Sequence, residues 1–250
     1  MAKDQEEMVE AQKLGVPMVN YFEALGLVVN SYYLIVVAGT HGKTTTTAML
    51  TDVLEEADLD PTAVIGSLRS KTGSNFRAGK SKYAVVEACE YKRDFLHLEP
   101  DILVITNIEL DHVDYYKDLV DVQNAFQTLA KKVPADGFIV ADVKNENVKP
   151  ILAGAVATVI DYREFVSLDL LMRQPGLHNR LNAGAVRAVA KKLEIDEKNS
   201  DQALSNFAGT WRRFEYKGIL HNGENEITVY DDYGHHPTEI KATISGTREL

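Results

Sequence analysis

Two hydrophobic patterns alternate along the chain from Tyr33 onward. Continuous apolar runs such as Ile102-Leu-Val-Ile105 are typical of strands in a parallel sheet that is covered on both faces. Segments with apolar residues at helical spacing lie between these runs. The patterns predict strands at 33–38, 62–66, 82–88, 101–106, 137–141 and 156–160, and helices at 42–57, 118–132 and 178–193. The predicted fold class is therefore α/β, a mostly parallel sheet of the P-loop type with flanking helices.

The two ends of the chain add further elements to this core. Asn222-Gly223 is a typical hairpin turn, and Pro237 is typical of a first helical turn. Because one strand-helix step after Ile227 is too little to close a core of its own, we expect the polypeptide to be a fragment or a trimmed form. The patterns predict helices at 3–15, 200–207 and 237–250, and strands at 215–220 and 226–231.

The stretch Gly39-Thr-His-Gly-Lys-Thr-Thr45 joins a predicted strand to a predicted helix. Glycines leave backbone N–H groups accessible, and together with the positive end of the helix these groups form a cradle suited to phosphate. Lys43 would then reach the outer phosphates, and the Thr44 hydroxyl a magnesium ion. The loop is a shortened form, because Val37 stands where the common pattern has its first glycine. The alternative is an ordinary strand-to-helix turn that happens to contain a lysine.

Polar residues follow two of the predicted strands at their carboxyl ends, where ligands bind in doubly wound folds. Glu87 lies at the tip of one strand and Glu90 just past it. The oxygen atoms of Thr44 and Glu87 are suitable magnesium ligands. The role of His112 stays open, since imidazole is not the preferred ligand of magnesium and a lone histidine can equally be a hydrogen-bonded structural group. The second strand is followed by an amide, two acids and an imidazole, namely Asn107, Glu109, Asp111 and His112.

Composition narrows the class of protein. A net charge of −10, from 27 Lys+Arg against 37 Asp+Glu, argues against nucleic acid or an anionic membrane surface as the main partner. No apolar run approaches the ~20 residues of a membrane span, and the first residues lack the apolar region of a signal peptide, so we expect a cytosolic protein. Cys89 is the single cysteine, which excludes an intrachain disulfide and a cysteine-based metal cluster.

Six short motifs resemble those of the Mur ligases, the ATP-dependent ligases of peptidoglycan synthesis. Six motifs in one order are far more specific than any one of them. The acidic motif after Glu87 is similar to that of the alanine-adding branch, and less to that of the branch that recycles a tripeptide. The segment 4–37 also resembles the end of the family's first domain. The motifs are GTHGKTTTT, EACEYKRDFL, TNIELDHVDYY, PGLHNRLNA, WRRFE and DDYGHHPTEI, which together span roughly residues 38–240.

The resemblance implies a ligase with ATP and Mg²⁺ as cofactors and UDP-N-acetylmuramate and L-alanine as substrates. ATP would convert the lactyl carboxylate to an acyl phosphate, which the amino group of L-alanine attacks with loss of phosphate. Such a reaction depends on positioning and on charge neutralisation. The resemblance also implies remnants of two further α/β domains around the central one. The expected division is 1–32 for the N-terminal UDP-sugar-binding domain, 33–211 for the central ATP-binding domain and 212–250 for the start of the C-terminal amino-acid-binding domain.

The family's functional residues carry over onto the matching positions of this sequence. By resemblance, Thr44 and Glu87 bind a first magnesium ion and His112 a second. Arg213, alone or together with Arg212, resembles the arginine that meets the γ-phosphate, a role that its planar donor fork suits. The predicted catalytic residues are Lys43, His112, Arg213 and His235. The predicted nucleotide-binding residues are Gly39, Thr40, His41, Gly42, Lys43, Thr44 and Thr45 in the loop, His178, Asn179 and Asn182 around the adenine, Arg213, and Asp232 at the ribose.

The sequence also departs from the family pattern. Gln127 stands where some relatives carry a carbamoylated lysine that holds the second metal, so we predict no carbamoyl-lysine. We expect most of the first domain and nearly all of the third to be missing, and the stretch from Ile160 to Pro175 is shorter than usual. An ATP-binding fragment without ligase turnover is therefore the main alternative. A P-loop GTPase or kinase is disfavoured, because the first loop glycine is missing and no Asn-Lys-x-Asp motif is present.

Overall fold

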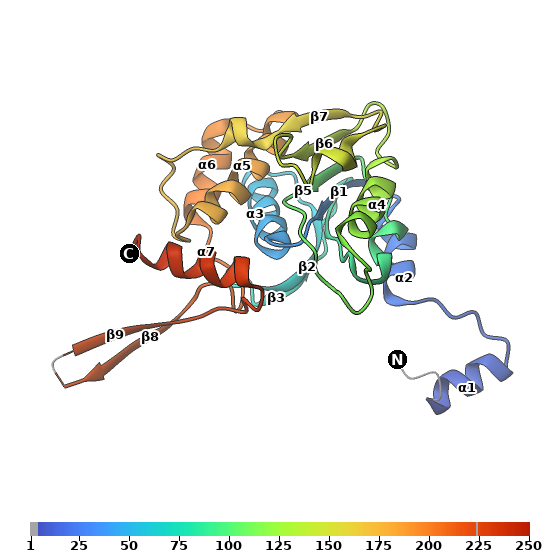
Figure 1. The fold of residues 1–250 in the computed structure, drawn as a ribbon, viewed down its shortest axis with the longest axis horizontal. Helices are drawn as coiled ribbons and strands as arrows, with labels where there is room; N and C mark the ends of the chain where they lie inside the picture. Colours follow the sequence, from blue (N-terminus) through green and yellow to red (C-terminus); the bar gives the residue numbers. More distant parts are fainter. Residues whose placement is uncertain (1–4, 224) are drawn as a thin grey trace.

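The computed structural model describes residues 5–223 and 225–250 of the chain. Its core is a seven-stranded sheet with the strand order β3-β2-β4-β1-β5-β6-β7 (Figure 1). Only β3 runs antiparallel to its neighbour, and the other pairs are parallel, which confirms the predicted fold class. The strands are β1 (Tyr33–Ala38), β2 (Thr62–Arg69), β3 (Ser74–Arg77), β4 (Tyr83–Glu87), β5 (Ile102–Ile105), β6 (Phe138–Ala141) and β7 (Thr158–Asp161).

Each face of the sheet has its own apolar core, because successive side chains of a strand point to opposite faces. In the central strand β1, Leu34 and Val36 pack on the face covered by α2 and α4, while Ile35 and Val37 pack on the face covered by α3, α5 and α6. All four side chains are fully buried. Coverage of both faces explains why the strands are continuous apolar runs. The α-helices of the body are α2 (Tyr21–Val29), α3 (Lys43–Glu56), α4 (Leu119–Ala130), α5 (Leu177–Lys192) and α6 (Glu197–Asn206).

Short 3-10 helices complete the connections between these elements. The segment η1 lies next to α2 and α4, η2 packs on α4, and η3 packs on α5. Their bounds are η1 (Tyr91–His97), η2 (Lys149–Leu152) and η3 (Tyr162–Phe165).

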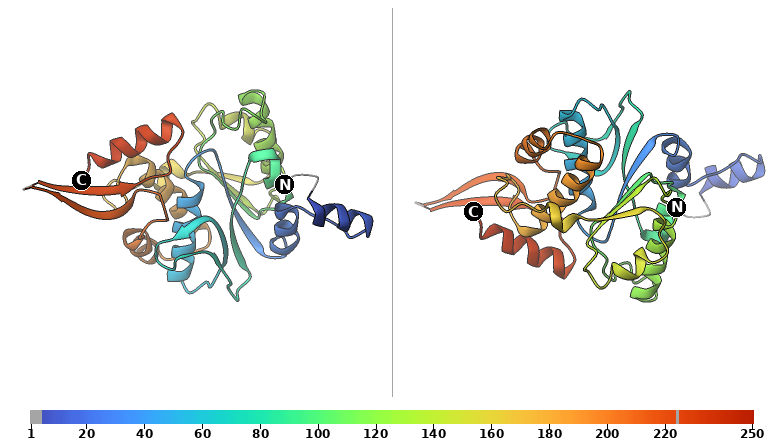
Figure 2. Two further views of the ribbon diagram at one scale, coloured as in Figure 1. Left: turned by 90° about the horizontal axis from the view of Figure 1, so that it is seen from below. Right: turned by 90° about the horizontal axis from the view of Figure 1, so that it is seen from above.

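The two ends of the chain extend from opposite sides of this body (Figures 1 and 2). At one end, α1 (Glu6–Lys13) contributes no buried residue. At the other, β8 (Glu215–Asn222) and β9 (Asn225–Asp231) form a separate two-stranded antiparallel ribbon that projects outward. The last helix, α7 (Pro237–Thr247), lies against the body near α5. In the described part of the chain, no helix combines the length and the apolar character needed to cross a membrane.

Most of the predicted elements are confirmed, and their ends shift by a few residues. The helix expected at 3–15 is α1, with residues 3 and 4 outside the described residues. The helix expected at 200–207 begins earlier, at Glu197, where Asp196 accepts a capping hydrogen bond. The final helix ends at Thr247 instead of continuing to residue 250. The elements not predicted are α2, the edge strand β3 and the 3-10 helices.

Candidate functional site

The loop from Gly39 to Gly42 joins β1 to α3 at the carboxyl end of the central strand. Gly39 has φ 138° and Gly42 φ 80°, values that favour glycine. A Cβ atom on Gly39 would lie 2.0 Å from Thr106 Oγ1, and one on Gly42 would lie 2.7 Å from Asn182 Oδ1. Both glycines are therefore required by backbone conformation and by close packing.

Side chains at the end of β5 hold this loop in place. Asn107 Oδ1 accepts a hydrogen bond from the His41 N–H at 2.8 Å, and Asn107 Nδ2 donates to the His41 carbonyl at 3.0 Å. The Thr106 hydroxyl donates to the same carbonyl at 2.6 Å. Among the described residues, no side chain caps the N-terminus of α3. Its first backbone N–H groups can therefore bind an anion, as helix N-termini do.

Lys43, the first residue of α3, folds back over the loop. Its Nζ donates to the carbonyls of Gly39 at 2.7 Å and Thr40 at 3.0 Å, and it lies 3.0 and 2.9 Å from the two carboxylate oxygens of Glu90. Burial alone would raise the pKa of Glu90, but the charge of Lys43 and hydrogen bonds from His112 and Lys43 outweigh it, so the pKa is lowered. Glu90 is therefore a buried anion that holds the ammonium group at the loop.

Thr44 and Glu87 come together beside the same helix end. The Thr44 hydroxyl donates to Glu87 Oε1 at 2.8 Å, and Glu87 Oε2 accepts from the Gly66 N–H at 2.5 Å. A Cβ atom on Gly66 would lie 2.4 Å from Glu87 Oε1, so a glycine is needed to leave room for the carboxylate. A hydroxyl and a carboxylate at the end of an anion-binding loop are the kind of oxygen ligands that magnesium prefers. The structure thus assembles the pair that the sequence predicted.

His112 lies close to Glu90 and Asp111. One ligand atom from each of the three side chains lies within 4.8 Å of the others, and His112 Nε2 is 3.6 Å from Glu90 Oε1. The hydrogen bond with Glu90 raises the pKa of His112 against the opposing effect of burial. Because Glu90 faces both Lys43 and His112, a cation bound here would compete with the lysine for the same carboxylate.

A cavity of about 310 Å³ lies beside the loop, between α5 and α7. Of the predicted nucleotide-binding residues, Gly39 and Thr40 in the loop and Lys43 and Thr44 at the start of α3 lie outside the cavity lining. The others form part of the cavity wall: His41, Gly42, Thr45, His178, Asn179, Asn182, Arg213 and Asp232.

Local hydrogen bonds fix the polar wall of this cavity. Asn179 Nδ2 donates to the Pro175 carbonyl at 2.8 Å. The Asp232 carboxylate accepts from the N–H groups of Phe214 and Gly234, both at 2.8 Å. Burial lowers the pKa of His178 by more than the charge of Asp232 raises it, so the net pKa is below its usual value. The imidazole is therefore neutral at pH 7. The cavity therefore offers neutral amide and imidazole groups on α5 and a carboxylate across from them.

The segment from Arg213 to α7 supplies the remaining predicted residues. Arg213 lines the cavity, 3.8 Å from the Glu239 carboxylate. The side chain of His235 is 62% exposed, and it is not among the residues that line the cavity. Its neighbour His236 lies against the loop instead, with its ring centroid 4.6 Å from that of His41. The structure thus brings Arg213 to the cavity but not His235.

Gln127 lies on α4, where its side chain has a structural contact. Its Nε2 donates to the carbonyls of Pro150 at 3.0 Å and Ala153 at 3.2 Å. The amide thus holds the η2 segment against α4.

Some residues that contact the site were visible in the sequence pattern, but that pattern gave them no role. Glu90, Asn107 and Glu109 follow strand ends, which is the signal that could have selected them. Glu239 contacts the loop from a helix that lies far along the chain; its place at the third position of that helix was a capping signal, but not a signal for this contact.

Comparisons with known proteins identify the family of the chain. The model of the Mur ligase middle domain matches residues 37–165. UDP-N-acetylmuramate--L-alanine ligase of Clostridium tetani (strain Massachusetts / E88) is 38% identical over 275 residues, which cover 99% of this chain and 59% of that protein. The chain thus spans less than two thirds of the length of the relatives that it matches.

Two solved structures share the fold. The crystal structure of UDP-N-acetylmuramate-alanine ligase from Thermotoga maritima has a TM-score of 0.81 and 29% sequence identity, and the match covers 100% of this chain and 62% of that one. The crystal structure of UDP-N-acetylmuramate:L-alanyl-gamma-D-glutamyl-meso-diaminopimelate ligase from Neisseria meningitides has a TM-score of 0.77 and 30% identity, covering 85% of this chain and 78% of that one.

Proposed function

The chain belongs to the Mur ligase family, and we propose that it carries the ATP site of a ligase that joins L-alanine to the lactyl carboxylate of UDP-N-acetylmuramate. The names of the relatives that are 37–39% identical over nearly the whole chain support these two substrates. The observation that carries the ATP site is the uncapped end of α3, with Lys43 and the Thr44–Glu87 pair beside a cavity of about 310 Å³. That volume is at the lower end of the range typical of small-molecule sites.

In this proposal the nucleotide extends from the cavity to the loop. The adenine contacts His178, Asn179 and Asn182, and the ribose contacts Asp232. The phosphates accept hydrogen bonds from the N–H groups between residues 39 and 45. Lys43 exchanges the carbonyls of its own loop for phosphate oxygens, a small movement because its Nζ already lies on the loop. Arg213 reaches the γ-phosphate from the opposite side.

The residues at the end of α3 also suit magnesium. Thr44 and Glu87 would hold one ion, and His112 with Glu90 and Asp111 would hold a second. When bound, Mg²⁺ supplies positive charge that offsets the negative charge on the transferred phosphoryl group. The chain itself positions these side chains: Gly66 makes room for Glu87, and Asp111 Oδ1 accepts from the His112 N–H at 2.7 Å.

The proposal also covers the domain boundaries, the role of His235 and the place of the reaction. We assign residues 33–211 to the ATP-binding domain, 1–32 to the end of a UDP-sugar-binding domain and 212–250 to the start of an amino-acid-binding domain. The projecting β8–β9 ribbon supports the boundary at residue 212, since its described residues pair with no strand of the main sheet. A catalytic role for His235 stays a prediction. We also place the reaction in the cytoplasm.

Calorimetry with a non-hydrolysable ATP analogue tests the nucleotide site. The wild-type chain should bind one analogue per chain, more tightly with Mg²⁺ than without it. Lys43→Ala should weaken binding, while Lys149→Ala should not, because Lys149 is half exposed and its only ion-pair partner among the described residues is Glu146. Absence of binding by the folded wild-type chain, with and without Mg²⁺, would refute the proposed site.

Mass spectrometry of the product tests the ligase reaction. The chain is incubated with ATP, Mg²⁺ and UDP-N-acetylmuramate, and with either L-alanine or the tripeptide that the recycling branch uses. Amide formed with L-alanine supports the proposal, and amide formed with the tripeptide alone overturns the choice of amino acid. If the chain binds the ATP analogue but forms neither amide, it is an ATP-binding module without ligase turnover.

A further inference from the structure

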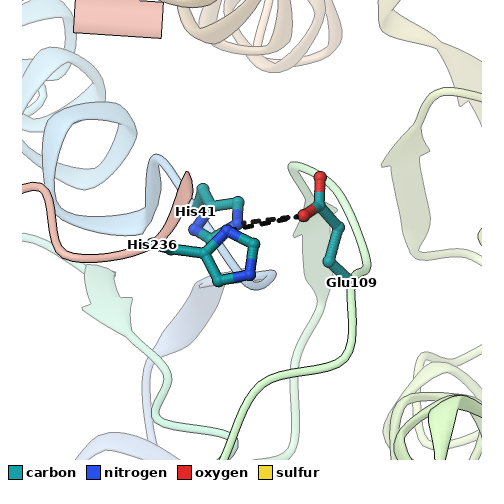
Figure 3. Close-up of side chains that lie close together, drawn as sticks. All are labelled: His41, Glu109 and His236. Carbon is teal, nitrogen blue, oxygen red and sulfur yellow. Dashed lines mark ion pairs between the residues drawn. The ribbon is translucent and has the colours of Figure 1, made fainter. Parts of the chain in front are cut away.

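Three potential metal ligands meet at a point where three segments of the chain converge (Figure 3). His41 lies in the phosphate loop, Glu109 follows β5, and His236 precedes α7. His41 Nε2 is 3.5 Å from Glu109 Oε2, and His236 Nδ1 is 3.7 Å from the same oxygen. One ligand atom from each side chain lies within 4.8 Å of the others. This group is separate from Glu90, Asp111 and His112, which form the other such group in the described residues.

The spacing of these atoms fits a tetrahedral ion. Bonds of about 2.1 Å from zinc to nitrogen or oxygen place the ligand atoms at the corners of a tetrahedron with edges of about 3.4 Å. The two measured separations, 3.5 and 3.7 Å, are close to that edge length. The side chains therefore need only small rotations to enclose an ion, and one of the four positions is left for water.

Glu239 fixes the orientation of His41. His41 Nδ1 is 3.2 Å from Glu239 Oε1, and since a carboxylate only accepts, Nδ1 carries the proton. Nε2 faces Glu109, is buried and has no hydrogen-bond partner among the described residues. A histidine that donates from one ring nitrogen to a carboxylate and directs the other toward the ion is the arrangement that metal-bound histidines have.

Neighbouring groups also orient the other two ligands. The Thr238 hydroxyl donates to Glu109 Oε2 at 2.8 Å, as outer partners of metal-bound carboxylates do. His236 Nδ1 accepts a longer hydrogen bond, 3.3 Å, from the Thr238 N–H. An ion would replace this weak contact with a bond to the metal.

The ligand set selects the class of ion. Two imidazole nitrogens and one carboxylate suit zinc and similar transition metals, whereas magnesium prefers oxygen ligands. We propose that His41, Glu109 and His236 bind a Zn²⁺-class ion, which fastens the start of α7 to the phosphate loop. The ion joins residues that are distant in the chain, so its binding holds the C-terminal segment closed over the cavity. The site does not depend on the proposed ligase function, since its three ligands are complete without nucleotide.

A zinc titration of the whole 250-residue chain tests the site. The chain is stripped of metal and studied by calorimetry with excess Mg²⁺ and without nucleotide. The wild type should bind one Zn²⁺, and His236→Gln should lose this binding. Glu239→Gln, which keeps all three ligands but replaces the carboxylate that pairs with His41 Nδ1 and caps α7, should weaken it about 10–100-fold. His221→Gln is the matched control, because that imidazole is 70% exposed in the ribbon, and it should leave zinc affinity unchanged.

Cobalt absorption and circular dichroism distinguish loss of the metal site from loss of the fold. Co²⁺ in place of Zn²⁺ should give the visible absorption of a four-coordinate ion in the wild type and not in His236→Gln. Circular dichroism checks that each variant is folded, and Glu109→Gln replaces His236→Gln if the latter does not fold. Equal zinc affinity of the wild type and the ligand variants overturns the proposal, and so does a loss of zinc binding caused by His112→Gln in place of His236→Gln. Because the titration contains no nucleotide, its failure leaves the ATP site untouched.

Discussion

Gly39→Ala tests whether close packing shapes the loop from Gly39 to Gly42. Gly39 has φ 138°, a conformation that is nearly restricted to glycine and costs another residue about 1–3 kcal/mol. The added Cβ would lie 2.0 Å from Thr106 Oγ1, so the hydroxyl must turn away from the His41 carbonyl that it contacts at 2.6 Å. Loss of a buried hydrogen-bond partner costs about 1–3 kcal/mol. The two effects together predict a loss of about 2–6 kcal/mol in the free energy of unfolding.

Urea unfolding of three variants separates these effects. Gly73→Ala is the matched control, because Gly73 has φ 66° and no atom lies within 4 Å of an added Cβ; backbone strain alone should cost it about 1–2 kcal/mol. In Gly39→Ala with Thr106→Ala the overlap with the hydroxyl is gone. The backbone strain, the close contacts of the Cβ with Asn107 O at 3.0 Å and Thr106 N at 3.1 Å, and the loss of the hydrogen bond to the His41 carbonyl should remain. The ATP analogue should bind Gly39→Ala at least tenfold more weakly, since the loop amides move. If Gly39→Ala is no less stable than Gly73→Ala, the packing argument is wrong.

Three further predictions concern charged groups. Lys43→Ala should weaken binding of the ATP analogue by about 1.5–3 kcal/mol, the usual loss for a hydrogen bond to a charged group, and unchanged affinity in calorimetry would contradict this role. His112→Ala should slow magnesium-dependent release of phosphate from ATP more than it weakens nucleotide binding, and equal losses of both would indicate a structural role. Burial alone would raise the pKa of Glu55, but hydrogen bonds and charge from Arg69 and Lys71 lower it from 4.5 to about 2. The charged form of Glu55 therefore adds stability above about pH 4.5 that is lost as the pH falls toward about 2. Urea unfolding should show the wild type more stable than Glu55→Gln near neutral pH and converging with it in acid; a constant difference would show that Glu55 does not titrate in this way.

The parts of the site that depend on regular structure were predictable from the sequence. The strand-loop-helix order around Lys43 is local, so the motif was sufficient to predict it. The Thr44–Glu87 pair follows from the rule that parallel strands end at the same edge of a sheet. In the structure, Val37 pairs with Glu87 in the register of β1 and β4, which places the carboxylate level with the start of the loop.

Contacts made by irregular backbone were not predictable in the same way. Glu90 turns toward Lys43 from a segment in which Lys92 and Arg93 have φ of 53° and 62°, and no periodic pattern reports such a bend. The helix α2 was missed because Gly26 interrupts its pattern, although the structure needs that glycine: a Cβ there would lie 2.4 Å from the His97 carbonyl oxygen. Asn20 and Glu23 form a capping box at the start of α2, and this pair was a usable signal for the helix.

The pair His235-His236 shows how a capping rule can decide between two adjacent residues. Pro237 at the first position of α7 and Glu239 at the third make His236 the N-cap residue. The side chain of an N-cap residue folds back over the start of its helix, and here the start of α7 faces the phosphate loop. Since consecutive side chains of extended backbone point in opposite directions, the preceding His235 turns toward solvent. The sequence His-Pro-Thr-Glu thus contained the information that His236, and not His235, folds back over the start of α7, while the position of that start beside His41 is known only from the structure.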